Sequence, residues 1–469
     1  MKLTNFRILL IFSITAILIQ SCSYDNEELD EEALGSESIE DATKGSNESN
    51  TTTDLIMDWN SLWVELDQHA FGMRPNATAR ALAYIHLAAY ETAVQDMRGY
   101  RSVENRFDEL QINQRERDRN ISLDLALNTC YALVFDHFMN NIDPEIDAKI
   151  GQLQSEYEDE LSKRLRRRDI RNSIEWGTHV AEQVIAYSQT DTEAETQILE
   201  PQPLDYEPPV GPGLWSYSAE QERGLFPYWG KVRTFIISSE ETSSIPPPIT
   251  YSTDPQSDYY AEMDEVYSVS TKAAEENNED LWIAEFWSDD VEGLMVSPPG
   301  RQIAIANQLI NQYNLDYDKS LAMLLKLGFS LNDAAVSSWA DKYEYLVMRP
   351  SVYIQEFINP DYQTNLFKFI FWPNPTFPGY PSGHSTFASA AAGIFINEFG
   401  NDINFTDRTH EGRTEFLGDP RQFDSFSEMA EENAFSRIPL GVHIRMDCVE
   451  GYRLGYEISD AVNKFRLRN

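Results

Sequence analysis

The strongest constraint on the fold is that apolar residues recur at helical spacing over much of the chain. Leu55, Trp59, Leu62 and Leu66 are an example, because residues three or four positions apart share one face of a helix. The ranges that show this period are 55–188, 255–290 and 302–345. No alternation of apolar and polar residues is long enough to predict a large sheet, and no internal repeat or glycine-rich nucleotide loop is present. The sequence therefore predicts an all-α protein built of helical bundles.

The middle of the chain departs from this pattern. Residues 190–260 lose the helical period and collect prolines, among them Pro246, Pro247 and Pro248. A long proline-rich loop inside a compact domain is often functional. We therefore expect one helical domain over residues 55–469. Its parts are an N-terminal half (about 55–190), a loop-rich segment (190–260) and a second helical half (about 261–469).

The N-terminus has the features of an exported lipoprotein. Lys2 and Arg7 precede an apolar run over residues 8–19, which has the length of a signal-peptide core rather than of a membrane span. Ile19-Gln20-Ser21-Cys22 resembles a bacterial lipobox, and the acidic residues that follow resemble the export signal of surface lipoproteins in Bacteroidetes. We expect a signal peptide (1–21), a lipid anchor on Cys22 and an acidic disordered tether (22–54). The expected location is the outer membrane, facing the periplasm or the cell surface; an ordinary secretory leader is the alternative.

The charge balance limits the possible ligands. With 37 Lys+Arg against 77 Asp+Glu, the formal net charge is -40. Such a field repels nucleic acid, so we expect no nucleic-acid partner, and any bound anion needs a local cluster of cations. The three cysteines are too few for a disulfide framework or a Cys-rich zinc module, and pairing of Cys130 with Cys448 stays open.

Two segments of the second half could supply such cations. Lys342 and Arg349 are seven residues apart, a spacing that predicts that they lie on the same face of one helix. Pro350 is expected to end that helix. In the segment 436–447, Arg437 has a planar, permanently charged guanidinium whose paired N–H groups suit an oxyanion. Taken alone, the pair Lys342 and Arg349 also fits a solvated helix face.

Two histidines stand beside these cations. Ser382, Gly383 and His384 lead into a run of small residues, so Ser382 should lie at a helix N-terminus that favours an anion, with His384 able to exchange a proton there. If a helix starts near Leu440, Asp447 lies one turn from His443 and accepts from its Nδ1, which leaves Nε2 free as a ligand or nucleophile. A capped helix with an exposed histidine, or a purely structural His–Asp pair, would look the same in isolation.

Together three segments, around residues 342–350, 381–384 and 436–447, match the pattern of the type 2 phosphatidic-acid phosphatase superfamily. That pattern is Lys, six residues, Arg-Pro; then Pro-Ser-Gly-His; then Ser-Arg, five residues, His, three residues, Asp, and every fixed position is met. The superfamily contains acid and lipid phosphatases and the vanadium-dependent haloperoxidases. The segments 80–90, 212–215, 227–233, 286–289 and 298–300 resemble the soluble haloperoxidases, most closely the bacterial iodoperoxidase-like branch. The resemblance covers roughly residues 70–460, and the catalytic half lacks the membrane-spanning runs of the lipid phosphatases.

The resemblance implies a role for each matching residue. His443 would bind vanadium through Nε2 with Asp447 fixing its tautomer, and His384 would be the acid–base residue. The groups that hold the vanadate oxygens would be Lys342, Arg349, Arg437, Ser382 and Gly383. Phe377, five positions before Ser382, lies where many algal bromoperoxidases have a histidine, which makes bromide a less expected substrate. Trp339 is a further candidate for the pocket wall.

The implied activity is oxidation of halide, with iodide the expected one, by hydrogen peroxide to hypohalous acid. Vanadate would act as a Lewis acid, so neither haem nor flavin is expected. The alternative is an acid phosphatase in which His443 attacks phosphorus and His384 protonates the leaving group. A third possibility is a non-enzymatic surface lipoprotein that captures glycans. We assign no role to His69, His137, His179 or His410, and expect His86 to pack between helices.

Overall fold

The computed structural model describes residues 39–114, 120–139, 141–217, 222–368 and 374–468. Within them the chain is mostly helical, and the prediction of an all-α protein is confirmed. The α-helices are α1 (Ile39–Asp67), α2 (Asn76–Ala93), α3 (Leu123–Phe138), α4 (Pro144–Ser162), α5 (Arg167–Gln189), α6 (Thr192–Leu199), α7 (Asp258–Glu276), α8 (Glu279–Phe286), α9 (Pro298–Gln312), α10 (Tyr317–Tyr345), α11 (Pro350–Phe357), α12 (Gly383–Phe399), α13 (Phe426–Phe435), α14 (Arg437–Leu440) and α15 (Arg445–Lys464). The short 3-10 helices are η1 (Glu104–Arg106), η2 (Trp229–Lys231) and η3 (Asn365–Lys368), and β1 (Asp402–Asp407) pairs with β2 (Arg421–Ser425) in an antiparallel hairpin. The account below concerns residues 46–469, which form one compact unit.

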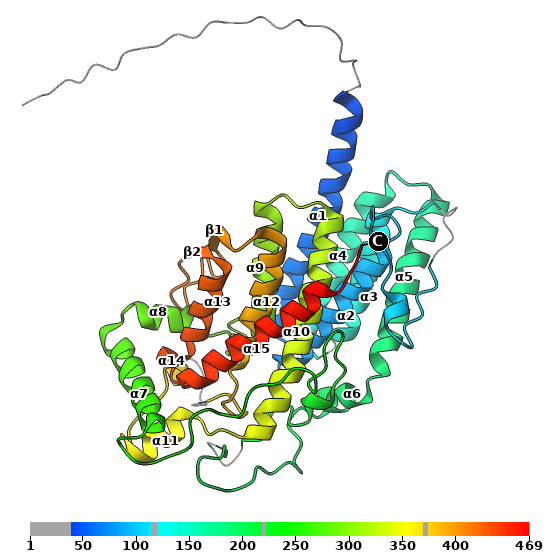
Figure 1. The fold of residues 1–469 in the computed structure, drawn as a ribbon. Coiled ribbons are helices and arrows are strands. Elements are labelled where there is room, and N and C mark those ends of the chain that lie inside the picture. The colour runs from blue at the N-terminus through cyan, green and yellow to red at the C-terminus, as the bar shows by residue number, and fades with distance from the viewer. Residues whose placement is uncertain (1–38, 115–119, 140, 218–221, 369–373, 469) are drawn as a thin grey trace, which may run out of the picture. The chain divides into compact units, whose positions relative to one another are not determined.

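The first half of this unit is organised around α2. Every side chain of α2 is buried, because α3, α5 and α10 pack against it on different sides (Figure 1). A helix that is apolar on nearly all faces is stable only inside such a bundle. α2 and α10 therefore join the N-terminal half to the half that carries the candidate site.

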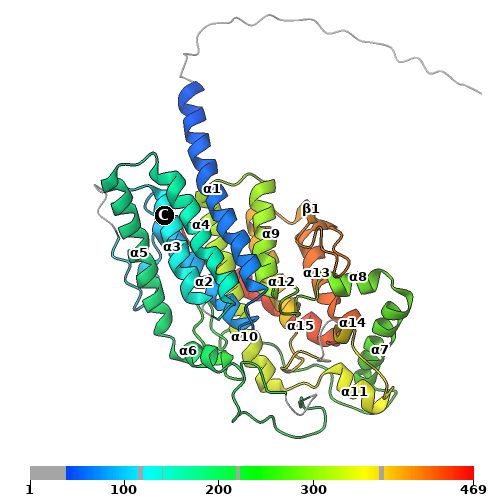
Figure 2. The same cartoon turned by 180° about the vertical axis from the view of Figure 1, so that it is seen from behind.

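The second half brings α10, α12 and α15 together (Figures 1 and 2). α12 and α15 approach closely because small residues line the contact. A Cβ atom at Gly451 would overlap the carbonyl oxygen of Ser382, and one at Gly455 would overlap that of Thr386. The close contact brings the N-termini of both helices to the same place, where the Ser382 N–H donates to the Asp447 carbonyl (2.9 Å). Two motifs that lie 60 residues apart in sequence thus become neighbours.

The proline-rich segment is not entirely loop. It begins with α6, whose N-terminal N–H of Ala194 is capped by Asp191, and η2 is its one further helical turn among the described residues 201–257. Asp333 of α10 anchors it, since its carboxylate accepts from the backbone N–H groups of Phe235, Ile236 and Ile237 (2.8–3.1 Å). Such buried hydrogen bonds fix a loop that has no helical partner of its own.

The N-terminal predictions are only partly covered by the described residues. The predicted signal peptide and Cys22 lie outside them. The tether predicted for residues 22–54 is corrected from residue 39 onward, because α1 begins at Ile39. The reason is that the end of the supposed tether has buried contacts: Thr52 and Thr53 are buried, and the Thr52 hydroxyl donates to Asp124 of α3.

Two further observations bear on cysteines and membranes. Cys130 of α3 and Cys448 of α15 are both buried free thiols, so the disulfide left open by the sequence is absent. None of the described helices combines the length and the apolar character that a bilayer crossing requires.

His86 lies on α2 and is 1% exposed, as expected for a histidine packed between helices. Within the described part of the chain, neither ring nitrogen has a hydrogen-bond partner, and burial lowers the pKa of His86 from 6.5 to about 3. Below pH 6.5 the unfolded chain therefore binds a proton on His86, whereas the folded chain keeps the ring neutral. This difference in proton binding lowers the free energy of unfolding as pH falls.

We predict that the His86→Leu variant gains stability relative to wild type on acidification. Between about pH 6.5 and about pH 4.5 the difference in free energy of unfolding should move by about 2–3 kcal/mol in favour of the variant. Urea unfolding at the two pH values measures this difference. The control is Leu87→Ala, which leaves a cavity in the neighbouring core but changes no titrating group, so it should lower the free energy of unfolding equally at both pH values. If the difference between His86→Leu and wild type did not change with pH, the lowered pKa of His86 would be contradicted.

Candidate oxyanion site

A cavity of about 540 Å³ lies where the three motif segments meet. Its wall includes Trp339, Phe377, Gly383, His384, Arg437 and His443. These residues come from the end of α10, the loop before α12, the first turn of α12, and the chain around α14. The structure therefore brings the sequence-predicted segments into one place.

Lys342, in the last turn of α10, is fully buried behind this wall. Its ammonium donates to the carbonyl oxygens of Pro378 (3.0 Å), Gly379 (3.1 Å) and Pro381. Burial, and then the nearby Arg349, lower the pKa of Lys342 well below its usual value. Three carbonyl acceptors require the three N–H donors of an ammonium, so this geometry favours the charged form of Lys342 and fixes the loop that leads into α12.

Arg349 reaches the site in a way that corrects the sequence prediction. It does not share a helix with Lys342, because α10 ends at Tyr345 and Leu346 takes a left-handed conformation (φ 50°). Pro350 does not end a helix but begins α11. Proline is favourable at the first helical position because the N–H that it lacks would have no partner within the helix. The guanidinium of Arg349 donates to the carbonyls of Phe377 (Nε, 2.9 Å) and Val442 (Nη1, 2.8 Å).

His443 is oriented by partners on both ring nitrogens. Arg349 Nη1 lies 3.0 Å from His443 Nε2, and because a guanidinium only donates, Nε2 accepts and carries no proton. The proton is therefore on Nδ1, which donates to Asp447 Oδ2 (3.0 Å). Burial, with Arg349 and Lys342 nearby, lowers the pKa of His443 well below 6.5, so the ring is neutral.

The pairing of His443 with Asp447 is present, but not on one helix as predicted. The expected helix from Leu440 is interrupted, since Gly441 adopts a left-handed conformation (φ 92°) that ends α14. α15 begins at Arg445, so His443 precedes it and Asp447 lies in its first turn. Burial raises the pKa of Asp447, while Lys342 and Arg349 oppose that rise.

The Ser382–His384 segment lies as predicted at a helix N-terminus. Ser382 is the N-cap of α12, and its hydroxyl accepts from the Ser385 N–H (3.4 Å). His384 Nε2–H donates to the Ser288 carbonyl (3.0 Å), so its Nδ1 carries the lone pair. Burial and the charge of Arg437 lower the pKa of His384 to about 3, which makes this ring neutral too.

Arg437 completes the set from α14. Its Nη1 donates to the carbonyls of Trp287 (3.1 Å) and Ser288 (3.2 Å), and its Nη2 pairs with the carboxylate of Asp290. Burial acts to raise the pKa of Asp290, but Arg437 and His384 hold it below its usual value. Sequence reasoning missed Asp290, although it directly follows the segment 286–289 that was already noted for its resemblance.

Phe377 and Trp339 form the apolar wall. Their ring centroids are 4.7 Å apart, and Lys342 Nζ and the Arg349 guanidinium each lie 5.1 Å from the Phe377 ring centre. Phe377 has no group that could exchange a proton, so the structure assigns it to the shape of the cavity rather than to proton transfer. Its contacts with both cations add a modest attraction.

The donors of this site fit a tetrahedral oxyanion. In the described part of the chain, Arg349 Nη2 and Arg437 Nε are buried and have no hydrogen-bond partner. Buried donors without partners are costly, and an oxyanion between them would satisfy both. Lys342, Arg349 and Arg437 bring three cations to the His443 side of the cavity, while Glu222, Asp289, Asp290 and Glu292 also line its wall.

Three comparisons with known proteins find similarity to vanadium haloperoxidases. Residues 322–468 match the family model described as the VCPO second helical-bundle domain. The chain is 26% identical to the vanadium chloroperoxidase of Curvularia inaequalis over 282 residues, which are 47% of this chain and 46% of the relative. The chain thus aligns with about half the length of that curated relative.

Solved structures extend the similarity over most of the fold. The first bacterial vanadium-dependent iodoperoxidase superposes with a TM-score of 0.78 at 25% identity, over 89% of this chain and 98% of that one. A holo-type bacterial vanadium-dependent chloroperoxidase superposes with a TM-score of 0.65 at 16% identity, over 84% and 92% of the two chains.

Proposed function

We propose that this chain, a relative of the vanadium-dependent haloperoxidases, binds vanadate at the oxyanion site and oxidises halide with hydrogen peroxide. The observation that carries the proposal is the pair of unpartnered buried guanidinium nitrogens beside an imidazole whose Nε2 is deprotonated. Vanadate, when bound, supplies a Lewis acid that activates peroxide without a change in its own oxidation state. Overall, halide, peroxide and one proton give hypohalous acid and water.

Each residue of the site has a separate role in this proposal. Asp447 keeps the proton of His443 on Nδ1, so that Nε2 is available to a metal. Arg349 and Arg437 stabilise negative charge on the oxygens, and Lys342 adds its charge from behind the loop. His384 presents Nδ1 as a base that takes a proton from peroxide and returns it to the leaving oxygen.

Iodide is the halide that we propose. The support is the iodoperoxidase among the similar folds and the absence of a histidine at position 377. A phenylalanine there gives the halide no hydrogen-bond donor, which suits the large, weakly hydrated iodide better than smaller halides.

A halide panel on vanadate-loaded protein tests this function. We expect peroxide-dependent oxidation of iodide to exceed that of bromide and chloride, with no activity after vanadate removal. The same cage could instead serve an acid phosphatase with His443 as the nucleophile. Rapid phosphomonoester hydrolysis that vanadate abolishes, together with no halide oxidation, would decide for the phosphatase.

A further inference from the structure

The segment Phe286–Asp290 connects α8 to the cavity and presents its backbone to two site residues. The Ser288 carbonyl accepts from His384 Nε2 (3.0 Å) and from Arg437 Nη1 (3.2 Å). This carbonyl therefore holds the proton of neutral His384 on Nε2. A residue that fixes the position of the Ser288 carbonyl therefore also keeps His384 Nδ1 free of a proton.

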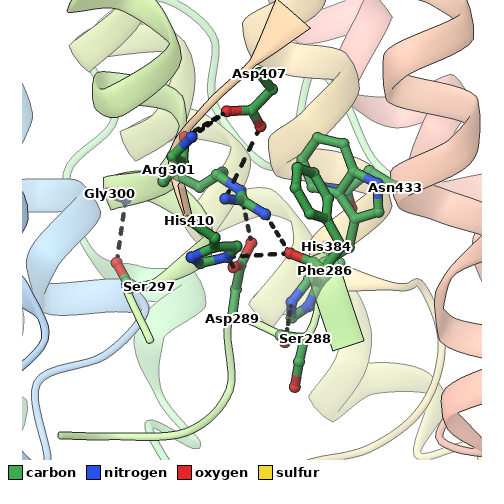
Figure 3. Close-up of polar contacts among 12 residues, drawn as sticks. Phe286, Ser288, Asp289, Ser297, Gly300, Arg301, His384, Asp407, His410 and Asn433 are labelled. Carbon is green, nitrogen blue, oxygen red and sulfur yellow. Dashed lines mark hydrogen bonds and ion pairs between the residues drawn. The ribbon is translucent and has the colours of Figure 1, made fainter. Parts of the chain in front are cut away.

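Arg301 of α9 also contacts this segment (Figure 3). It is fully buried, and its guanidinium lies over the rings of Phe286 and Trp287, 4.6 and 4.7 Å from their centres. Its Nη2 donates to the Phe286 carbonyl. The contact of the guanidinium with two rings and its hydrogen bond to a carbonyl together make this a site that lysine cannot reproduce.

Two carboxylates and a histidine surround Arg301. Asp289 Oδ2 lies 3.7 Å from its Nε and Asp407 Oδ2 lies 3.9 Å from its Nη1. His410, from the loop after β1, donates to the Phe286 carbonyl (3.2 Å), and its Nε2 lies 4.0 Å from Asp289 Oδ1. The four side chains are buried, so the attraction between Arg301 and the two carboxylates is weakly screened.

Asp289 forms a left-handed turn in this segment. Its φ is 48°, a conformation that aspartate tolerates better than most residues other than glycine. Its carbonyl accepts from Arg74 Nη2 (2.9 Å), and its carboxylate is the one held near Arg301. The turn lies between the Ser288 carbonyl and the Asp290 side chain, both of which contact Arg437.

We propose that Arg301 is a positioning residue for His384. With Asp289, Asp407 and His410, it fixes the turn that directs the Ser288 carbonyl to His384 Nε2, and so leaves Nδ1 free of a proton. The effect on the tautomer needs no cofactor. Its effect on the reaction rests on the function proposed above.

The experiment compares Arg301→Lys with wild type by nitrogen NMR of the histidine rings in the vanadate-free protein near neutral pH. The His384 signals are assigned by their loss in His384→Gln. We expect the share of His384 with its proton on Nδ1 to rise in Arg301→Lys. After vanadate loading, kcat should fall about tenfold to a hundredfold because the base is misplaced.

Arg80→Lys is the matched control. Arg80 is also a buried arginine, contacts two acids (Asp191 and Glu195), donates to the Ser188 carbonyl and lies over the Tyr84 ring, but it belongs to the N-terminal half. It should reproduce the loss of packing and leave the His384 signals unchanged.

A second variant covers the case in which Arg301→Lys does not fold. Asp289→Asn keeps a side chain that tolerates the left-handed turn and replaces the carboxyl group near Arg301 with an amide, so it should shift the tautomer in the same direction by less. Wild-type His384 signals in a folded Arg301→Lys, or in Asp289→Asn when that is the only variant to fold, would overturn the positioning role. A tautomer shift in a protein without peroxidase activity would instead uphold it and overturn the proposed function.

Discussion

The His443→Ala variant should lose vanadate binding. His443 Nε2 is the deprotonated ring nitrogen held beside Arg349, so the variant removes the metal ligand and leaves the Arg349 guanidinium without that partner. Changes to groups that only orient a metal ligand typically cost 10–100-fold in affinity, so loss of the ligand itself should weaken binding by at least about a hundredfold. Isothermal titration with vanadate measures this, and halide oxidation should disappear in parallel.

The control for this variant is His137→Ala, at the end of α3 and outside the cavity wall. It should bind vanadate like wild type. A His443→Ala protein that is folded and still binds vanadate with wild-type affinity would show that the oxyanion is held by the cations alone, and the proposed coordination would be wrong.

The sequence predicted which residues meet in the site better than it predicted how they meet. Spacing placed Ser382 at a helix start because a capping side chain before small residues is a local signal. Arg349 and His443 were wrongly placed inside helices, since the left-handed residues Leu346 and Gly441 interrupt them. Leucine at such a position has no local signature, so helical spacing alone could not reveal the break.

The residues that sequence reasoning missed act through tertiary contacts. Asp290 meets Arg437 across 147 positions, and Arg301 reaches Phe286 from the next helix. His410 was given no role because its neighbours in sequence offer no partner, whereas in the fold it lies beside Asp289. Carboxylates are abundant in a chain of this composition, so no sequence pattern could single out Asp289 and Asp290 as the ones that meet the arginines of the site.

His384→Ala should keep vanadate binding but lose most of the turnover. Removing a positioned acid–base group typically costs 10²–10⁴-fold, so we expect kcat for halide oxidation to fall by about that factor.

The pH dependence of the reaction tests the same role. Burial and Arg437 lower the pKa of His384 to about 3, so the ring stays neutral far below pH 6.5 in the vanadate-free protein. A bound anion shifts this pKa upward. The base is the neutral form, so wild-type kcat/KM for peroxide should fall as acidification protonates His384, and this acidic limb should be missing in the variant. Steady-state kinetics across pH, with vanadate affinity measured alongside, test both statements. A variant that retains the acidic limb would place the catalytic base elsewhere in the cavity.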